Sequence, residues 1–274
     1  MIASELTDRE DHTMTRPLGL MACIVLMLGL TAVGCGGGGS SSSPDTLRSG
    51  LIHWWRLDGN ATDSAGSLNG IVQGPMVFST GIYGQAAVGN GQTTGIAVPD
   101  STDMQLQGPF TLSAWVNTTA APSAGQLTEA IFFRGDDRSG ADPVLLCVNH
   151  SSQIIFEVDG DSSSDSLIGP VTFGKFVLVT AINDPSTGQM RLYENGQLVA
   201  SNSSAVTPVK DLDPTAHPGI GIDCNNDFPN SSFNFSFNGG VDDVRVYNRR
   251  LSDAEVLALY NQGVASALTT GAPH

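Results

Sequence analysis

The stretch FTLSAWV, residues 110–116, places apolar side chains at every second position: Phe110, Leu112, Ala114 and Val116. A period of two is typical of a β-strand that buries one face and exposes or pairs the other. The stretch therefore predicts a strand in the core of a sheet-based protein.

Similar short apolar runs recur on both sides of this strand. Turn-forming sequences such as Asp58-Gly59-Asn60 and Asn238-Gly239-Gly240 separate the runs. About ten short strands, with no long amphipathic helix, are typical of a β-sandwich or jelly roll. The expected strands lie at residues 51–57, 96–98, 130–133, 144–148, 154–158, 176–181, 190–193, 220–223, 233–237 and 241–247.

One helix is expected near the C-terminus. Ser252 and Glu255 have the spacing of a capping box, in which the serine caps the helix and the glutamate reaches back to it. Gly263 is a stop signal for this helix. We therefore predict a short helix that ends near Gly263 and a flexible tail at residues 264–274.

Composition limits the classes of partner. The 274 residues are 40% apolar, enough for one well-packed core. Twelve Lys and Arg against 27 Asp and Glu give a net charge of −15. A nucleic-acid-binding protein needs a basic surface to displace counterions, so this balance argues against nucleic acid as a partner.

The N-terminal segment has the pattern of an export signal. Residues 18–33 are apolar and uncharged, about four residues shorter than the ~20 needed to span a bilayer. The run closes on Ala32-Val33-Gly34-Cys35, which resembles a bacterial lipobox. We predict a lipoprotein signal peptide at residues 1–34, with translation starting at Met1 or Met14. An ordinary signal peptide with a chance cysteine is the alternative.

Lipidation of Cys35 would anchor the protein in the bacterial cell envelope, at the outer membrane or the cell surface. Residues 36–43 are all Gly or Ser, so residues 35–47 are predicted to form a flexible tether. The lipid anchor is then the protein's only expected contact with the membrane.

Two cysteines remain after export and lipidation, Cys147 and Cys224. Disulfides persist in the compartments outside the cytoplasm, and both cysteines lie at the ends of apolar runs. A disulfide between neighbouring strands is one interpretation. Two buried free thiols that pack as small apolar side chains are the other.

Five blocks in order resemble the laminin-G-like jelly rolls of the concanavalin A-like lectin/glucanase superfamily. The resemblance implies an all-β, concanavalin A-like jelly-roll sandwich of two antiparallel sheets with a short C-terminal helix, over residues 48–263. The chain departs from the family where Val88-Gly89-Asn90-Gly91 replaces Phe-Asp-Gly and Phe176-Val177 replaces Trp-His. The blocks are LIHWWRLDGNATDSAG (51–66), GIYGQA (81–86), FTLSAWV (110–116), RLYENG (191–196) and VDDVRVYNRRLS (241–252).

The resemblance implies that a hydrolase of this superfamily would carry the motif Glu-x-Asp-x-x-Glu on one strand. This motif presents a nucleophile and an acid about 5–5.5 Å apart. The nearest match here begins with Glu157 and Asp159, but Ser162 stands in place of the second glutamate. The sequence also lacks a Gly-x-Ser-x-Gly nucleophile motif and the His spacing of a zinc site. We therefore predict no catalytic residues.

Strict alternation in the last strand places Asp242 on one face with Val244 and Val246, and Asp243 on the other with Arg245. If the valine face is the core, Asp242 is a buried carboxylate that needs a cation or hydrogen bonds.

The family resemblance implies a structural calcium ion with an aspartate at the place of Asp242. Asp58, Asn60 and Asp63 lie in a tight turn, and their oxygens suit a hard cation that takes 6–8 ligands. A calcium site of these four residues is one prediction. The alternative is that the turn residues serve the turn and hydrogen bonds satisfy the aspartate.

Trp54 and Trp115 are the predicted ligand-binding residues, because their faces could stack on a sugar ring, whereas Trp55 is expected in the core. The sequence thus predicts a surface-anchored, non-catalytic binding module for a polysaccharide or glycoconjugate, or for adhesion. A divergent glycoside hydrolase or lyase, and a purely structural envelope module, are the alternatives.

Overall fold

A computed structural model describes residues 46–99, 101–122, 128–135, 142–210, 219–222 and 235–274. The predicted signal peptide, Cys35 and nearly all of the tether lie outside these residues, as does Cys224. The predictions made for those segments therefore stay predictions.

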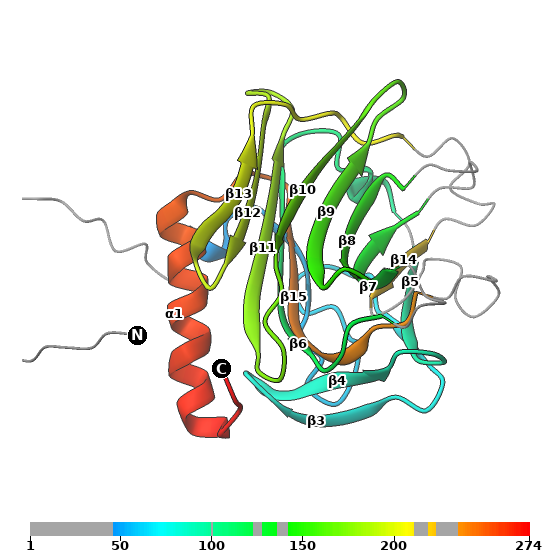
Figure 1. The fold of residues 1–274 in the computed structure, drawn as a ribbon, viewed down its shortest axis with the longest axis vertical. Coiled ribbons are helices and arrows are strands. Elements are labelled where there is room, and N and C mark those ends of the chain that lie inside the picture. The colour runs from blue at the N-terminus through cyan, green and yellow to red at the C-terminus, as the bar shows by residue number, and fades with distance from the viewer. Residues whose placement is uncertain (1–45, 100, 123–127, 136–141, 211–218, 223–234) are drawn as a thin grey trace, which may run out of the picture. The chain divides into compact units, whose positions relative to one another are not determined.

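Two antiparallel sheets pack face to face, which confirms the predicted sandwich (Figure 1). The eight-stranded sheet has the order β13-β12-β11-β6-β15-β4-β3, with β1 also paired to β15. Its strands are β1 (Leu51–Trp55), β3 (Val77–Gly81), β4 (Gly84–Asn90), β6 (Phe110–Thr118), β11 (Val177–Asp184), β12 (Gln189–Glu194), β13 (Gln197–Asn202) and β15 (Asn238–Tyr247).

The seven-stranded sheet has the order β10-β9-β8-β7-β14-β5-β2. Its strands are β2 (Ile71–Gln73), β5 (Gly95–Pro99), β7 (Thr128–Arg134), β8 (Val144–Asn149), β9 (Gln153–Asp159), β10 (Ser164–Pro170) and β14 (Gly219–Ile222). Two short 3-10 turns, η1 (Thr46–Arg48) and η2 (Thr102–Gln105), precede β1 and β6.

The main core lies between the sheets. The four predicted inward residues of β6, at positions 110, 112, 114 and 116, are buried there together with Phe132 and Phe156 of the opposite sheet. Phe110 and Phe156 meet edge to face, with 6.2 Å between ring centroids. The period-two pattern of this strand thus predicted its buried face correctly.

The helix α1 (Asp253–Thr270) covers the outer face of the eight-stranded sheet (Figure 1). Both predicted bonds of its capping box are present: the Ser252 hydroxyl accepts from the backbone of Glu255, and the Glu255 carboxylate accepts from the backbone of Ser252. The beginning of the helix was therefore predicted correctly.

The predicted end of the helix at Gly263 is wrong. The helix continues to Thr270, because Gly263 packs against Trp115 so closely that a Cβ at this position would lie 2.1 Å from the indole. Residues 264–274 are not a flexible tail either, since Ala267 and Ala272 are buried. Tertiary packing here overrides the local stop signal.

The folded domain begins inside the predicted tether. Leu47 belongs to η1 and packs into the cluster beneath α1, with an exposed fraction of 3%. Among the helices that the structure describes, none is long and apolar enough to cross a membrane.

Cys147 lies on β8, where it is buried and forms no disulfide with any residue that the structure describes. It packs with Ala130, Phe133 and Leu145 in a small apolar cluster of the seven-stranded sheet. Burial, with a further contribution from the negative charges of nearby carboxylates, raises the pKa of this thiol well above its usual value. The predicted disulfide to Cys224 is not shown, because Cys224 lies outside the described residues.

Candidate functional site

Strand β15 changes its neighbour halfway along. Residues 238–241 pair with β4, and residues 244–247 pair with β1. Asp242 and Asp243 lie between these two pairings, where β4 leaves the strand and β1 joins it. We call this place the β1/β4 junction.

A β-bulge at the junction corrects the predicted orientation of Asp242. Asp242 pairs with Trp115 of β6, and Arg245 pairs with Ser113, so three steps along β15 match two along β6. Asp243 adopts a positive φ of 55° and supplies the extra residue. Asp242 therefore lies on the outer face with Trp115 and not with the inward-facing Val244.

Asp242 is fully buried beneath the β3–β4 turn. Its Oδ2 accepts a hydrogen bond of 3.0 Å from the backbone of Tyr83, and its Oδ1 has no hydrogen-bond partner among the described residues. Burial, reinforced by the charge of Asp243, raises the pKa of Asp242 to about 8. The carboxyl group is therefore mostly protonated at neutral pH.

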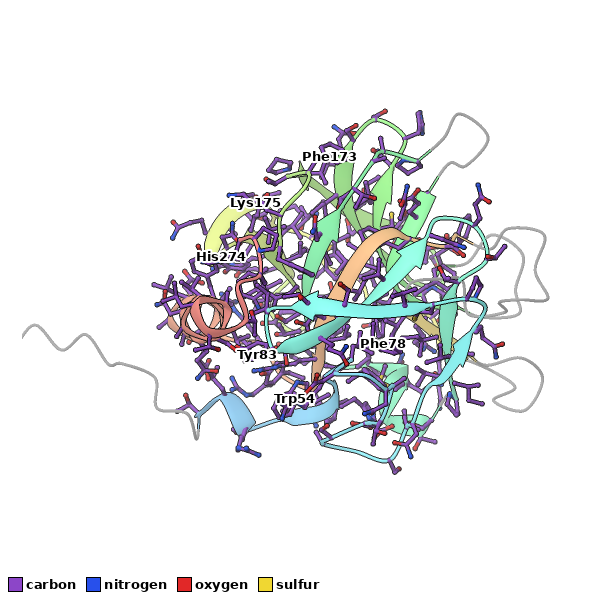
Figure 2. All side chains as sticks on the ribbon, turned by 90° about the horizontal axis from the view of Figure 1, so that it is seen from below. Trp54, Phe78, Tyr83, Phe173, Lys175 and His274 are labelled. Carbon is purple, nitrogen blue, oxygen red and sulfur yellow. The ribbon has the colours of Figure 1, made fainter. Side chains whose placement is uncertain are left out.

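Arg245 holds the junction together. Its guanidinium lies 2.9 Å from the Asp243 carboxylate and 4.7 Å from the ring centroid of Trp54. Trp54 donates from Nε1 to the same carboxylate at 2.5 Å, and the ring centroid of Tyr83 lies 5.9 Å from the guanidinium. Figure 2 labels Trp54 and Tyr83, the two aromatic residues near this guanidinium. Burial alone would lower the pKa of Arg245, but the Asp243 charge raises it, so the arginine stays charged.

Asp63 organises the loop that follows β1. Its Oδ1 accepts from the backbone of residues 54, 65 and 66, and its Oδ2 accepts from the backbone of residue 68 and from Nδ1 of His53 at 2.7 Å. Burial would raise the pKa of Asp63, but these hydrogen bonds outweigh it and lower the pKa. Both carboxylate oxygens are thus committed to the loop.

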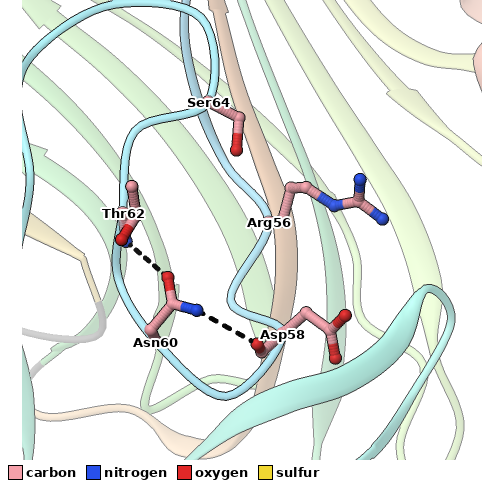
Figure 3. A pocket seen from close by; sticks show the side chains of 5 residues that line it. All are labelled: Arg56, Asp58, Asn60, Thr62 and Ser64. Carbon is pink, nitrogen blue, oxygen red and sulfur yellow. Dashed lines mark hydrogen bonds between the residues drawn. The ribbon is translucent and has the colours of Figure 1, made fainter.

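The outer side of this loop forms a pocket of about 410 Å³, which we call the loop pocket. It is lined by five alternating residues, Arg56, Asp58, Asn60, Thr62 and Ser64 (Figure 3). Asn60 braces the loop by accepting from the backbone of Thr62 at 2.9 Å and donating to the carbonyl of Asp58 at 3.3 Å. The Asp58 carboxylate accepts from the backbone of Gln85 at 3.0 Å.

These positions do not fit the predicted calcium site. Asp63 has no oxygen left for a cation, and Asp242 is buried under the β3–β4 turn. Asp58 and Asn60 line an open pocket next to a positive charge, Arg56. Within the described segments, no group of three or more His, Cys, Asp or Glu residues is arranged to hold a metal ion. The alternative, in which the turn residues serve the turn, describes Asp63 correctly, whereas hydrogen bonds satisfy only one of the two carboxyl oxygens of Asp242 among the described residues.

The structure separates the two predicted sugar-stacking residues. Trp115 is 1% exposed and stacks on Tyr260 of α1, with 5.8 Å between ring centroids. The prediction that Trp115 offers a free face is therefore wrong, because the helix covers it. Trp54 is half-buried and borders the loop-pocket residue Arg56, whose guanidinium lies 5.3 Å from its ring centroid. Trp55 is buried in the core, as predicted.

The carboxylates that come nearest to a hydrolase pattern lie on the other sheet. Glu157 and Asp159 belong to β9, and Asp159 accepts from the backbone of Asp142 at 2.8 Å. Burial, followed by the charges of the two aspartates, raises the pKa of Glu157. The strand ends at Asp159, before the position where the family's second glutamate would stand.

Sequence reasoning missed Arg56, Thr62 and Ser64 as site residues. The signal was present, since positions 56, 58, 60, 62 and 64 are all polar and alternate with other residues. A period of two is expected of strands only, whereas here it extends into the loop after β1.

Comparison with known proteins identifies the family of the chain. A family model described as "Concanavalin A-like lectin/glucanases superfamily" matches residues 90–257. Domain 4 of the extracellular GH43 arabinanase AbnA from Geobacillus stearothermophilus, solved in complex with arabinotriose, has a TM-score of 0.56 and 20% identity. The similarity covers 77% of this chain and 98% of that domain.

Botulinum neurotoxin structures are also similar. A type C structure, described as showing entry that depends on two ganglioside molecules, has a TM-score of 0.60 and 16% identity over 81% of this chain. The binding domain of neurotoxin DC, in complex with SialylT, has a TM-score of 0.59 and 14% identity over 79% of this chain. This chain spans about half of each toxin chain, 53% and 52%. No curated protein sequence matches the chain significantly.

Proposed function

The chain belongs to the concanavalin A-like lectin/glucanase superfamily, and on that premise we propose that it is a glycan-binding module without catalytic activity. The observation that carries the proposal is the loop pocket. Its five lining residues offer hydroxyl, amide, carboxylate and guanidinium groups in one small open space.

Such a lining suits a saccharide, because sugar hydroxyls need both donors and acceptors at fixed positions. Asn60 and Asp58 are held in place by backbone hydrogen bonds, so the pocket is organised before a ligand arrives. A pre-formed site lowers the entropic cost of binding. Trp54 adds a half-buried aromatic ring beside the pocket.

The arabinanase domain supports this proposal more directly than the toxins do. Nearly all of that domain is covered by the similarity, and its structure contains arabinotriose. The toxin chains are matched over only half of their length, so their gangliosides can lie on the unmatched half.

The absence of catalysis is proposed from the β9 carboxylates. A retaining glycosidase needs two carboxyl groups on either side of the scissile bond. Glu157 has Asp159 beside it, but the motif's second glutamate is replaced by Ser162. We also propose that lipidated Cys35 holds the module at the cell surface, where glycan binding would serve adhesion.

The test is a glycan array followed by calorimetric titration of the purified mature chain. Binding in the millimolar to micromolar range is expected, about −4 to −8 kcal/mol, because few groups contact the ligand. The double variant Thr62→Val and Ser64→Ala should weaken binding, since it removes two pocket hydroxyls.

The matched control is Ser162→Ala with Ser163→Ala, which removes two exposed hydroxyls far along the chain from the pocket. It should leave binding unchanged. Release of reducing sugar from a bound polysaccharide, abolished in Glu157→Gln, would show instead that the protein is a hydrolase.

A further inference from the structure

We propose that the loop pocket selects carboxylated sugars, such as uronic acid residues, through the guanidinium of Arg56. This inference rests on the proposed function and specifies the class of glycan that the site takes.

Arg56 has no carboxylate partner among the described residues, whereas four other arginines of the domain each have one. It is exposed, and within the described part of the chain its guanidinium makes no hydrogen bond or ion pair to a carboxylate. Exposed Arg48 is the other described arginine without a carboxylate or hydrogen-bond partner. The paired carboxylates are Asp253 for Arg191, Asp243 for Arg245, Glu255 for Arg249 and Asp184 for Arg250.

The position of Arg56 distinguishes it from Arg48. Its guanidinium lies 5.3 Å from the ring centroid of Trp54, and Arg56 is one of the residues that line the loop pocket. Trp54 is itself fixed by its hydrogen bond to Asp243. The stacking favours an ordered, forked donor at the pocket, and a guanidinium fork matches the two oxygens of a carboxylate.

Asp58, the acidic residue of the loop pocket, narrows the class of anion that the pocket can bind. One oxygen of Asp58 accepts from the backbone of Gln85, which leaves the other to accept from a ligand. A compact anion such as phosphate would bring its charge close to Asp58 and be repelled by it. A sugar acid satisfies both groups, because its carboxylate can pair with Arg56 while its hydroxyls donate to Asp58.

The negative net charge of the chain makes the binding of acidic sugars depend on Arg56. At −15 the protein repels anionic ligands at long range, so an acidic sugar gains nothing from the general surface. Its binding must come from the short-range contact in the pocket. Removal of the Arg56 guanidinium should therefore abolish the preference for acidic over neutral sugars.

The experiment titrates the mature chain with D-glucuronate and D-galacturonate, and with their neutral parents, glucose and galactose. We expect each acid to bind at least tenfold more tightly than its parent. Arg56→Gln should remove the preference, and Arg56→Lys should retain part of it as a point charge without the fork. Arg48→Gln, which removes an exposed charge outside the pocket, is the control and should behave as the wild type.

Equal binding of acids and neutral sugars, unaffected by Arg56→Gln, would overturn this inference and leave the proposed function standing. An acid preference that survives in Arg56→Gln would also overturn it, by placing the anion elsewhere. Failure of all four sugars, together with an empty glycan array, would overturn the proposed function itself.

Discussion

Asp243 and Arg245 form a buried ion pair at the bulge of β15, with 2.9 Å between Oδ2 and Nη2. Their side chains are only 4% and 8% exposed. The pair joins β15 to β1 through Trp54, whose indole donates to the same carboxylate. Strand β1, which leads directly into Arg56 and the loop pocket, is thus tied to the centre of the eight-stranded sheet.

Removal of one partner from this ion pair should destabilise the fold strongly. Asp243→Asn leaves the guanidinium of Arg245 buried without a countercharge, and we expect it to lower the free energy of unfolding by about 3–5 kcal/mol. Denaturant unfolding measures the loss, and the double variant with Arg245→Met should recover part of it. The exposed pair of Arg191 and Asp253 is the control, expected to contribute at most about 1 kcal/mol. Equal losses for the two pairs would contradict the assignment.

The raised pKa of Asp242 predicts a loss of stability as pH rises. The unfolded chain releases this proton near pH 4, and the native chain releases it near pH 8. Between these values the native state holds more protons, so its stability falls with increasing pH and levels off above about pH 8. Asp242→Asn cannot titrate, and its stability relative to the wild type should therefore rise between pH 5 and pH 8.

Urea unfolding at several pH values measures that difference. Glu129, whose pKa burial raises to about 7, contributes to both proteins and cancels in the comparison. A constant difference across the range would show that Asp242 is ionised in the native state.

The contact between Gly263 and Trp115 predicts an unusual sign for a helix substitution. Alanine normally stabilises a helix interior by up to about 1 kcal/mol relative to glycine. Gly263→Ala should instead lower the free energy of unfolding by about 1–3 kcal/mol, because the new methyl group meets the indole at 2.1 Å. Trp115→Ala should cost about 3–5 kcal/mol, and the folded fraction should still bind glycan. A stabilised Gly263→Ala variant would contradict the packing of α1.

The proposed lipid anchor predicts a membrane-bound protein. Cys35→Ala should release the chain from the membrane fraction and abolish the incorporation of labelled palmitate, because no thiol then remains at the end of the signal peptide. Fractionation of cells that express each form measures this effect. A variant that still sediments with membranes and still carries label would show that another residue is the anchor.

The sequence predicted correctly the features that depend on interactions between residues close together in the chain. The alternation in residues 110–116 and the capping box of Ser252 and Glu255 are both satisfied as predicted. The hydrogen bonds of Asp63 come mostly from its own loop, and this possibility was one of the two alternatives stated from the sequence.

The misplaced residues depend on contacts between distant segments. A single extra residue at Asp243 reverses the face of Asp242, and no periodicity in β15 reveals a bulge that is fixed by pairing with two different strands. Gly263 is a stop signal in the local sequence, but its packing against the distant Trp115 keeps it inside the helix. Arg56 becomes a site residue only because the loop after β1 folds back around the pocket.

The central claim is that a glycan binds in the loop pocket, and an NMR titration of the ¹⁵N-labelled mature chain tests it most directly. With the best ligand from the array, we expect the largest amide shifts at residues 56–64 and at the indole N–H of Trp54, and no change in the saccharide itself over time. Shifts centred instead on β9 around Glu157, or cleavage of the saccharide during the titration, would contradict the account.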